Sequence, residues 1–362
     1  MNEPLFGITN LDGIIVIGII LFFSLGETVA GYLVVTKRTV GDWIQEFGGF
    51  VALSFVYKPL IIFGAFTLGH LVVPNIQNAV ANYYFVPVFL CYLLVDDILQ
   101  YWYHRCGHEY DFLWKLHRPH HQAEEMGFFV SYRNAGLYYL LMPNIWWVGV
   151  MMFLGGAKAV AVGLIVKQIV IIGSHSLVRW DEILYKYKYL NPLATVIERI
   201  IVTPSFHYAH HGKSMIDRIS DPNGNYGNMF SIWDQMFGTA KFTRLFPSEI
   251  GLVNDPKDKW TASYFYPLIA SDKPESEISR GFNKEWTTVL EPTICEFAEG
   301  QDFLWCRCGR SHNQPFCDGS HHGTKLKPLL CSAKRDGRLK LCQCKRTKSP
   351  PYCDNSHSLI KS

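Results

Sequence analysis

The chain of 362 residues carries a formal net charge of +3, and 49% of its residues are hydrophobic and 15% aromatic. This length predicts two or more domains. The apolar composition excludes an ordinary soluble enzyme and favours a chain that lies partly in a bilayer. From Trp305 onward, Lys and Arg far outnumber Asp. Such a basic region attracts an anionic membrane surface or an acidic redox partner, or it is a solvated face. Nothing else in the sequence supports nucleic-acid binding.

Five apolar runs reach the roughly 20 residues that a membrane-spanning helix needs. They cover residues 14–35, 47–73, 83–103, 135–154 and 157–177. The segment before the first run has no basic region and no small-residue cleavage site, so this run is expected to be a retained membrane helix. Lys37 and Arg38 predict that its C-terminal end faces the cytoplasm. Alternation of the spans then puts His104 and His175 on that same face, and His70 on the opposite one.

Three ionisable residues, Glu27, Lys58 and Lys167, lie inside these runs. Charges within a membrane are costly and usually face protein or water. Glu27 and Lys58 lie at depths that differ by about one helical turn. We therefore expect these two residues to form an ion pair.

Nine of the 14 histidines fall between His104 and His211. They form the patterns His104-x3-His108, His117-x2-His120-His121 and His207-x2-His210-His211, with His175 alone at a helix end. Residues four apart share one face of a helix, and imidazole is a good ligand for iron, copper and zinc. So many ligands suit two metal ions better than one, and a structural zinc site usually includes cysteine.

These boxes and the sequences around them, DDILQYWYHRCGHEYDFLWKLHRPHHQAEE and TPSFHYAHHGKS, resemble the fatty acid hydroxylase superfamily of membrane di-iron enzymes. The resemblance covers roughly residues 85–245. It implies two iron ions held by His104, His108, His117, His120, His121, His175, His207, His210 and His211. Asp97 lies two turns before His104 and is expected to hydrogen-bond a ligand histidine. Asp234 is either a similar partner or a loop residue, and we favour the second interpretation.

Eight of the ten cysteines lie from Cys295 onward, which excludes a disulfide framework throughout the chain. Six of them belong to an internal duplication with an offset of 36 residues. The two matching sets are Cys306, Cys308, Cys317 and His321, then Cys342, Cys344, Cys353 and His357. Three thiolates and one imidazole bind either zinc or a [2Fe–2S] cluster, and the spacing alone does not decide between them.

The sequence PFCDGSH in the first copy resembles the CDGSH iron–sulfur domain, which implies a [2Fe–2S] cluster in each copy and an internal pseudo-dimer. The second copy has Asn355 where glycine is usual. Asparagine tolerates a positive φ better than other non-glycine residues, so we expect this site to be kept. Cys295 and Cys331 are interpreted as packing residues. His312 and His322 are interpreted as bystanders.

The predicted architecture is an all-α integral membrane domain at residues 1–245, with four or five spans and a cytoplasmic helical cap. A connector at 246–292 and a small β-rich iron–sulfur domain at 293–362 follow. The site would lie on the cytoplasmic face of a bacterial inner membrane or the endoplasmic reticulum. The predicted function is O2-dependent hydroxylation of a C–H bond in a lipid or sterol-like substrate at the di-iron site. Electrons from a reductase would be relayed to this site by the fused [2Fe–2S] clusters. A desaturase and a membrane-anchored iron–sulfur sensor or cluster-transfer protein remain as alternatives.

Overall fold

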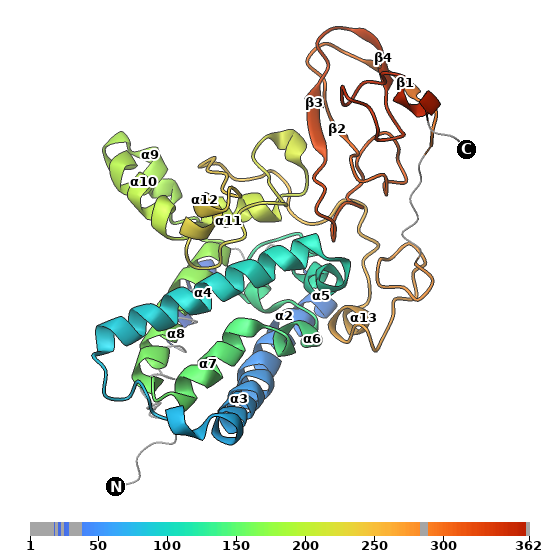
Figure 1. Cartoon of the computed structure of the whole chain (residues 1–362). Coiled ribbons are helices and arrows are strands. Elements are labelled where there is room, and N and C mark those ends of the chain that lie inside the picture. Colours follow the sequence, from blue (N-terminus) through green and yellow to red (C-terminus); the bar gives the residue numbers. More distant parts are fainter. Residues whose placement is uncertain (1–17, 19–20, 23–24, 29–37, 283–288, 360–362) are drawn as a thin grey trace.

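The computed structural model describes residues 18, 21–22, 25–28, 38–282 and 289–359. A helical part is followed by a smaller part that contains the strands, as Figure 1 shows. The prediction of a mostly helical membrane domain with a β-rich C-terminal part is therefore confirmed. The first predicted span, residues 14–35, lies largely outside the described residues.

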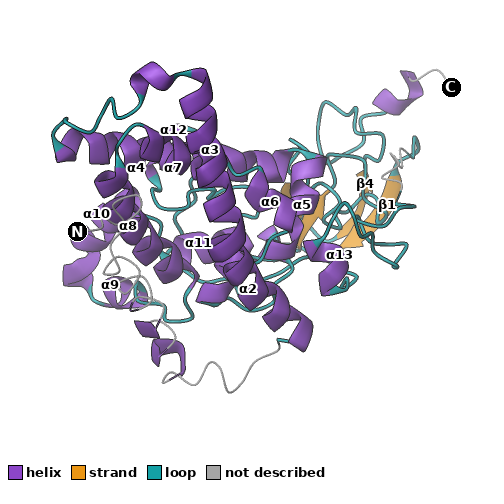
Figure 2. Ribbon diagram, turned by 90° about the horizontal axis from the view of Figure 1, so that it is seen from below, coloured by secondary structure: helices purple, strands orange, loops and turns teal. Residues whose placement is uncertain are grey.

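Within the described residues, four helical segments are long and apolar enough to cross a membrane. The first is Val40–Val72, which joins α2 (Val40–Ala52) to α3 (Lys58–Val72) through a π-helical turn, and Figure 2 shows the two in line. Pro59, the second residue after this turn, lacks a backbone N–H, which favours widening of the helix there. The other three are α4 (Phe85–Glu109), α6 and α7 (Gly136–Leu140 and Pro143–Phe153), and α8 (Ala157–His175).

Small residues let these helices pack closely. A Cβ atom added at Gly149 of α7 would lie 2.5 Å from the Cβ of Ala65 in α3, and one added at Gly163 of α8 would lie 2.3 Å from the Tyr92 ring in α4. Van der Waals packing of this kind drives association of helices in lipid. The turns at the far end of the bundle also meet, since the backbone N–H of Val80 donates to the carbonyl of Leu154. The ends of α4 and α8 that carry His104, His108 and His175 therefore lie at the opposite end, whereas His70 in the last turn of α3 lies near these turns.

Short helices build a cap over that end. They are α5 (Asp111–His121), α9 (Glu182–Lys186), α10 (Asn191–Ile200), α11 (Pro204–His211) and α12 (Ile232–Met236). The predicted connector also folds onto the cap and contains α13 (Trp260–Tyr264). Arg118 of α5 forms buried ion pairs with Asp255 (2.7 Å) and Asp258 (2.6 Å) of this segment.

The strands pair across the internal duplication. β1 (Thr293–Phe297) pairs with β4 (Gly337–Leu341), and β2 (Asp302–Trp305) pairs with β3 (Leu329–Ser332), both antiparallel. Each two-stranded sheet thus combines the first strand of one copy with the second strand of the other. This reciprocal exchange is the arrangement expected of an internal pseudo-dimer. It buries Phe297, Trp305 and Leu341 in one shared core.

Candidate metal centre and cysteine sites

The nine histidines of the boxes converge on one buried region. Helix α4 supplies two of them, α5 three, α8 one and α11 three, and each is at most 5% exposed. Within the described residues they form two groups, in each of which the donor atoms lie within 4.8 Å of one another. The first group is His104, His108, His117, His121 and His210. The second is His120, His175, His207 and His211.

Backbone and amide oxygens fix the orientation of several rings. Nδ1 of His104 lies 2.8 Å from the carbonyl of Tyr226, and Nδ1 of His210 lies 2.7 Å from that of Gly224. Only a protonated Nδ1 donates to a carbonyl, so in each neutral ring Nε2 carries a lone pair. These two Nε2 atoms face each other at 3.0 Å. Two lone pairs this close repel each other unless a cation lies between them. Two nitrogen ligands at right angles on one metal ion, with bonds of about 2.1 Å, have this spacing.

Further observations fit a metal centre. Nε2 of His117 and of His121 is buried and has no hydrogen-bond partner within the part of the chain that the structure describes. Burial also lowers the pKa of the cap histidines, His117, His120, His121, His207, His210 and His211, well below the usual 6.5. These rings are therefore neutral at physiological pH, which is the form that binds metal.

The second layer around the histidines differs from the prediction for Asp97. Asp97 accepts hydrogen bonds from the backbone of Met229 and Phe230 and from the Trp233 indole, and not from a histidine. Asp234 accepts from the backbone N–H groups of Tyr226 (2.8 Å) and Gly227. Both carboxylates therefore brace the loop whose Tyr226 carbonyl orients His104. Asp234 lies in α12 and not in a loop, but its contacts agree with the structural role that we favoured.

Sequence reasoning missed the residue that orients His117. Its Nδ1 lies 2.8 Å from Oδ1 of Asn134, which is buried. Asn134 follows a short 3-10 helix in a segment that resembles no metal-binding motif. The spacing of residues along the sequence therefore did not predict the contact between His117 and Asn134, because the two residues belong to separate segments.

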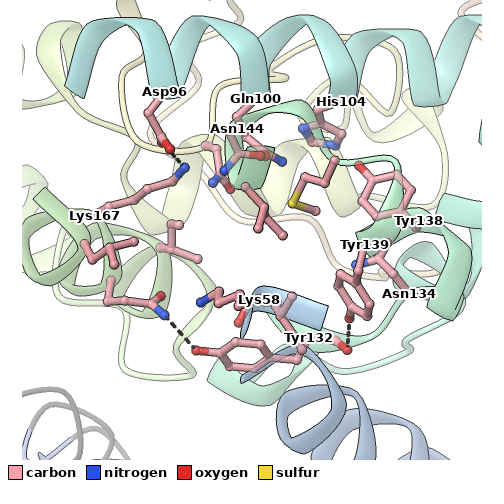
Figure 3. Close-up of a pocket in the computed structure, with 18 of the residues that line it drawn as sticks. Lys58, Asp96, Gln100, His104, Tyr132, Asn134, Tyr138, Tyr139, Asn144 and Lys167 are labelled. Carbon is pink, nitrogen blue, oxygen red and sulfur yellow. Dashed lines mark hydrogen bonds and ion pairs between the residues drawn. The ribbon is translucent and has the colours of Figure 1, made fainter. Parts of the chain in front are cut away.

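A cavity of about 130 Å³ lies beside the histidines, within the membrane bundle. Figure 3 shows His104, Tyr138 and Tyr139 at one side of it, Asp96 and Lys167 at the opposite side, and Lys58 beside Tyr132 at the bottom. Lys167 donates a hydrogen bond to Asp96. The predicted ion pair between Glu27 and Lys58 is wrong.

Glu27 instead accepts hydrogen bonds from the hydroxyl of Ser176 and the backbone N–H of Leu177, both at 3.0 Å. It thus lies against the C-terminal end of α8, whereas Lys58 lines the cavity. Glu27 and Lys58 lie at similar depths in their predicted spans, but depth alone does not reveal the direction in which each side chain points.

The donors of each cysteine site form two close pairs. In the first copy, the sulfurs of Cys306 and Cys308 are 3.8 Å apart, and Cys317 Sγ lies 3.2 Å from Nδ1 of His321. In the second copy, the corresponding distances are 3.5 Å and 3.5 Å. Among the described residues, only the two histidine groups gather every donor within 4.8 Å. Two separated pairs suit a two-iron cluster better than a single tetrahedral zinc ion.

The backbone at the two motif glycine positions matches the expectation. Gly319 has φ +93° and Asn355 has φ +67°. Asparagine thus stands at a position that needs a positive φ.

The C-terminal part that carries both cysteine sites, called the cysteine module below, contacts the helical cap directly. Nε2 of His321 lies 2.8 Å from the amide nitrogen of Asn223. His322, interpreted as a bystander, is 9% exposed and stacks on Trp114 of α5 with ring centroids 4.3 Å apart. The bystander interpretation concerns cluster binding and stays a prediction, but it did not foresee that His322 packs between the cysteine sites and the cap. The side chain of His312 is exposed and 3.7 Å from Asp318.

Fold and sites together define an integral membrane protein with a histidine-rich metal centre and a duplicated cysteine–histidine module. Comparison with known proteins gives the same two parts. The fatty acid hydroxylase family model matches residues 89–239, and the model for iron-binding zinc fingers of the CDGSH type matches residues 281–322. The histidine-bearing part of the chain thus resembles a fatty acid hydroxylase domain, and the first cysteine site resembles a CDGSH-type iron-binding domain.

Similar proteins fall into the same two groups. Alkylglycerol monooxygenase from Caenorhabditis elegans is 28% identical over 215 residues, which is 58% of this chain and 35% of that protein. The Xenopus tropicalis enzyme is 30% identical over 40% of this chain and 28% of its own length. The chain thus spans about a third of the length of these relatives.

The mouse mitochondrial CDGSH iron-sulfur domain-containing protein 3 is 60% identical over 30 residues, which is 8% of this chain and 22% of that protein. The crystal structure of human mitochondrial inner NEET protein (MiNT)/CISD3 is 40% identical and covers 21% of this chain and 84% of its own, with a TM-score of 0.20. That score is too low to support any statement about the fold.

Proposed function

We propose that this chain is a membrane monooxygenase that hydroxylates a C–H bond of a lipid, at two iron ions held by the nine histidines. Hydroxylation consumes O2, two electrons and two protons, and it yields an alcohol and water. Iron bound at such a site supplies reduction of O2 and removal of hydrogen from carbon. The observation that carries the proposal is the pair of histidine groups beside a cavity within the membrane bundle.

The protein's own residues have three tasks in this proposal. Carbonyl and amide oxygens hold the rings with Nε2 facing inward, as for His104 and His117. The Tyr138 ring stacks on His117 with centroids 5.0 Å apart and limits its movement. Apolar residues such as Ile145 and Val148 line the cavity and keep water away from the reacting carbon.

Electrons would come from a separate reductase through a [2Fe–2S] cluster in each cysteine site. The paired donors of both sites and the CDGSH family match of the first copy support this assignment. A tethered redox module raises the effective concentration of the electron donor at the centre. In this proposal residues 1–245 form the oxygenase, 246–292 the connector and 293–362 the electron-transfer module, with the sites on the cytoplasmic face.

The names of the relatives make glycerol ether lipids the first substrates to test. Membranes that contain the full chain would be incubated with an alkylglycerol, a reductase and 18O2, and the lipids analysed by mass spectrometry. We expect a product that carries one 18O atom, and no such product from a His117→Ala/His120→Ala variant. An unlabelled olefin would instead identify a desaturase. Absence of any histidine-dependent lipid product would refute the proposal.

A further inference from the structure

The first cysteine site and the histidine centre are joined by a continuous set of ring contacts. His321 stacks on His322 with centroids 4.4 Å apart, and His322 stacks on Trp114 at 4.3 Å with an interplanar angle of 13°. The Trp114 ring in turn lies 5.3 Å from His108 and 5.7 Å from His121. One end of the set is a predicted cluster ligand, and the other end is a pair of metal-ligand candidates.

Several contacts hold this arrangement in place. Trp114 is 1% exposed, and its indole N–H donates to Glu277 at 2.7 Å. The backbone N–H of Gly323 donates to the carbonyl of His108 at 3.0 Å. Gly323 has φ +70°, and a Cβ atom there would lie 2.7 Å from Cα of Asp111, so glycine permits this close approach. These contacts therefore hold the first cysteine site close to the histidine centre.

The second cysteine site contacts the first through Trp305. The indole of Trp305, which directly precedes Cys306, donates to the carbonyl of Cys342 at 2.8 Å. The Lys345 ammonium lies 4.8 Å from the centroid of the Trp305 ring and interacts electrostatically with cysteines of both sites. His357 is only partly buried, and its neighbours Asn355 and Ser358 are exposed. An external donor thus has access to the second site, while the first faces the histidine centre.

We propose that electrons pass from the second site to the first and then reach the histidine centre through His322 and Trp114. This route rests on the proposed function. A [2Fe–2S] cluster accepts one electron at a time, so two clusters hold the two electrons that one hydroxylation requires. The reductase supplies both electrons, one after the other. The alcohol receives one atom of O2, and the other leaves as water with the two protons.

The test follows oxidation of the clusters in the full-length protein. Clusters would be reduced without oxygen and then mixed rapidly with O2 and lipid, and the return of the visible absorption of oxidised clusters would be timed. We expect His322→Leu and Trp114→Leu to slow this return severalfold, and His322→Phe, which keeps a stacked ring, to slow it less. His312→Leu, which alters an exposed histidine of the same module, is the matched control and should leave the rate unchanged.

Two further measurements make the outcome decisive. Redox titration should give unchanged cluster potentials in His322→Leu, because that residue is not a ligand. Cluster absorption and iron content identify variants that have not folded, and His322→Leu carries the test if Trp114→Leu is one of them. An unchanged rate in a folded His322→Leu protein would overturn the route. If even the native protein transfers electrons no faster than His117→Ala/His120→Ala, the relay itself fails.

A separate observation concerns the end of the cavity away from the cysteine module. Oδ1 of Asp96, Oε1 of Gln100 and Oδ1 of Asn144 are buried and have no hydrogen-bond partner within the described residues. All three residues line the cavity, as does Lys58 (Figure 3). Buried acceptors without donors are costly. Gln100 lies one helical turn before His104.

We infer that this polar end binds the free hydroxyl groups of a lipid. Hydroxyl groups donate to the three oxygens and accept from the Lys58 ammonium, whereas a plain hydrocarbon satisfies none of these groups. The inference deepens the proposed function, because it assigns the cavity to a lipid with a hydroxylated head. It also accounts for charged and amide residues in a cavity that otherwise has mostly apolar walls.

Binding without turnover tests this assignment. The full chain in lipid nanodiscs would be heated with 1-O-hexadecylglycerol or with its 2,3-di-O-methyl derivative, since a ligand that binds the folded state raises the melting temperature. We expect a larger rise with the free hydroxyl groups. Lys58→Met should remove that difference, and Lys158→Met, which alters an exposed lysine of α8, should keep it.

Equal shifts by the two lipids in the native protein would overturn the assignment. If Lys58→Met does not fold, Asn144→Leu tests the same contact. Because the assay needs no electrons and no reaction, its result is independent of whether the protein hydroxylates lipids.

Discussion

The histidine centre and the cysteine sites are assembled in opposite ways. The histidines come from the four helices α4, α5, α8 and α11, and every ring is buried. Each cysteine site instead comes from one short segment, as in Cys306–His321, and it repeats almost contact for contact in the second copy. The first kind of site depends on the whole helical fold, whereas the second depends on local turns. This difference predicts how each site responds to damage.

The largest effect should follow loss of a histidine at the centre of the fold. His210→Ala removes a ring whose Nε2 faces that of His104 at 3.0 Å, so we expect loss of bound iron and of lipid hydroxylation. Metal analysis and product formation measure the two effects. His70→Ala is the control, because His70 contacts Gln77 at the far end of the bundle. Full activity of His210→Ala would contradict the assignment of the centre.

A cysteine substitution should affect its own site alone. Cys317→Ser is expected to halve the acid-labile sulfide and to spare the second cluster and the iron of the histidine centre. Turnover with the reductase should stop, while turnover with a small-molecule electron donor should continue. Cys353→Ser is the symmetrical variant. Loss of both clusters in either variant would show that the sites are not independent.

Removal of an orienting residue should have an intermediate effect. Asn134→Ala leaves Nδ1 of His117 without its partner at 2.8 Å. Changes of this kind typically cost about 10- to 100-fold in metal affinity or activity. Iron retention against a chelator measures the effect, and Asn134→Asp, which keeps an acceptor oxygen, should be milder. Equal retention in Asn134→Ala and the native protein would remove Asn134 from the centre.

The same contrast explains which features the sequence predicted. The sequence could group the donors of each cysteine site, because these donors and the glycine position lie within one repeated motif. The histidine boxes and the apolar runs could also be recognised in the sequence, since helical spacing determines which residues share a face. The hydrogen-bond partners of the histidines could not be predicted, because Asn134 and the carbonyls of Tyr226 and Gly224 come from distant segments.

Asp97 and Glu27 show most clearly which contacts the sequence does not predict. Asp97 does lie two turns before His104, but its carboxylate meets a loop that arrives from residues 229–233. Glu27 meets the end of α8, not the lysine at a similar depth. Position along a helix is readable from sequence, whereas the direction of the nearest neighbour requires the tertiary structure. The contact of His322 was missed for the same reason, because its partner Trp114 belongs to the other domain.

The smallest effect should come from the one difference between CDGSH at Cys317–His321 and CDNSH at Cys353–His357. Asn355 has φ +67° and its side chain is exposed, so Asn355→Gly should change the free energy of unfolding by less than about 0.5 kcal/mol. Gly319→Ala places a Cβ at φ +93° and should cost about 1–2 kcal/mol. Chemical denaturation followed by cluster absorption measures both.

Occupancy of the second cluster should then be the same in Asn355→Gly and the native chain, because either residue permits the turn that presents Cys353 and His357. A second cluster that appears only in the glycine variant would show that the asparagine impairs the site. The two copies would then differ in function as well as in sequence, and the order of electron transfer would have to start at the first copy.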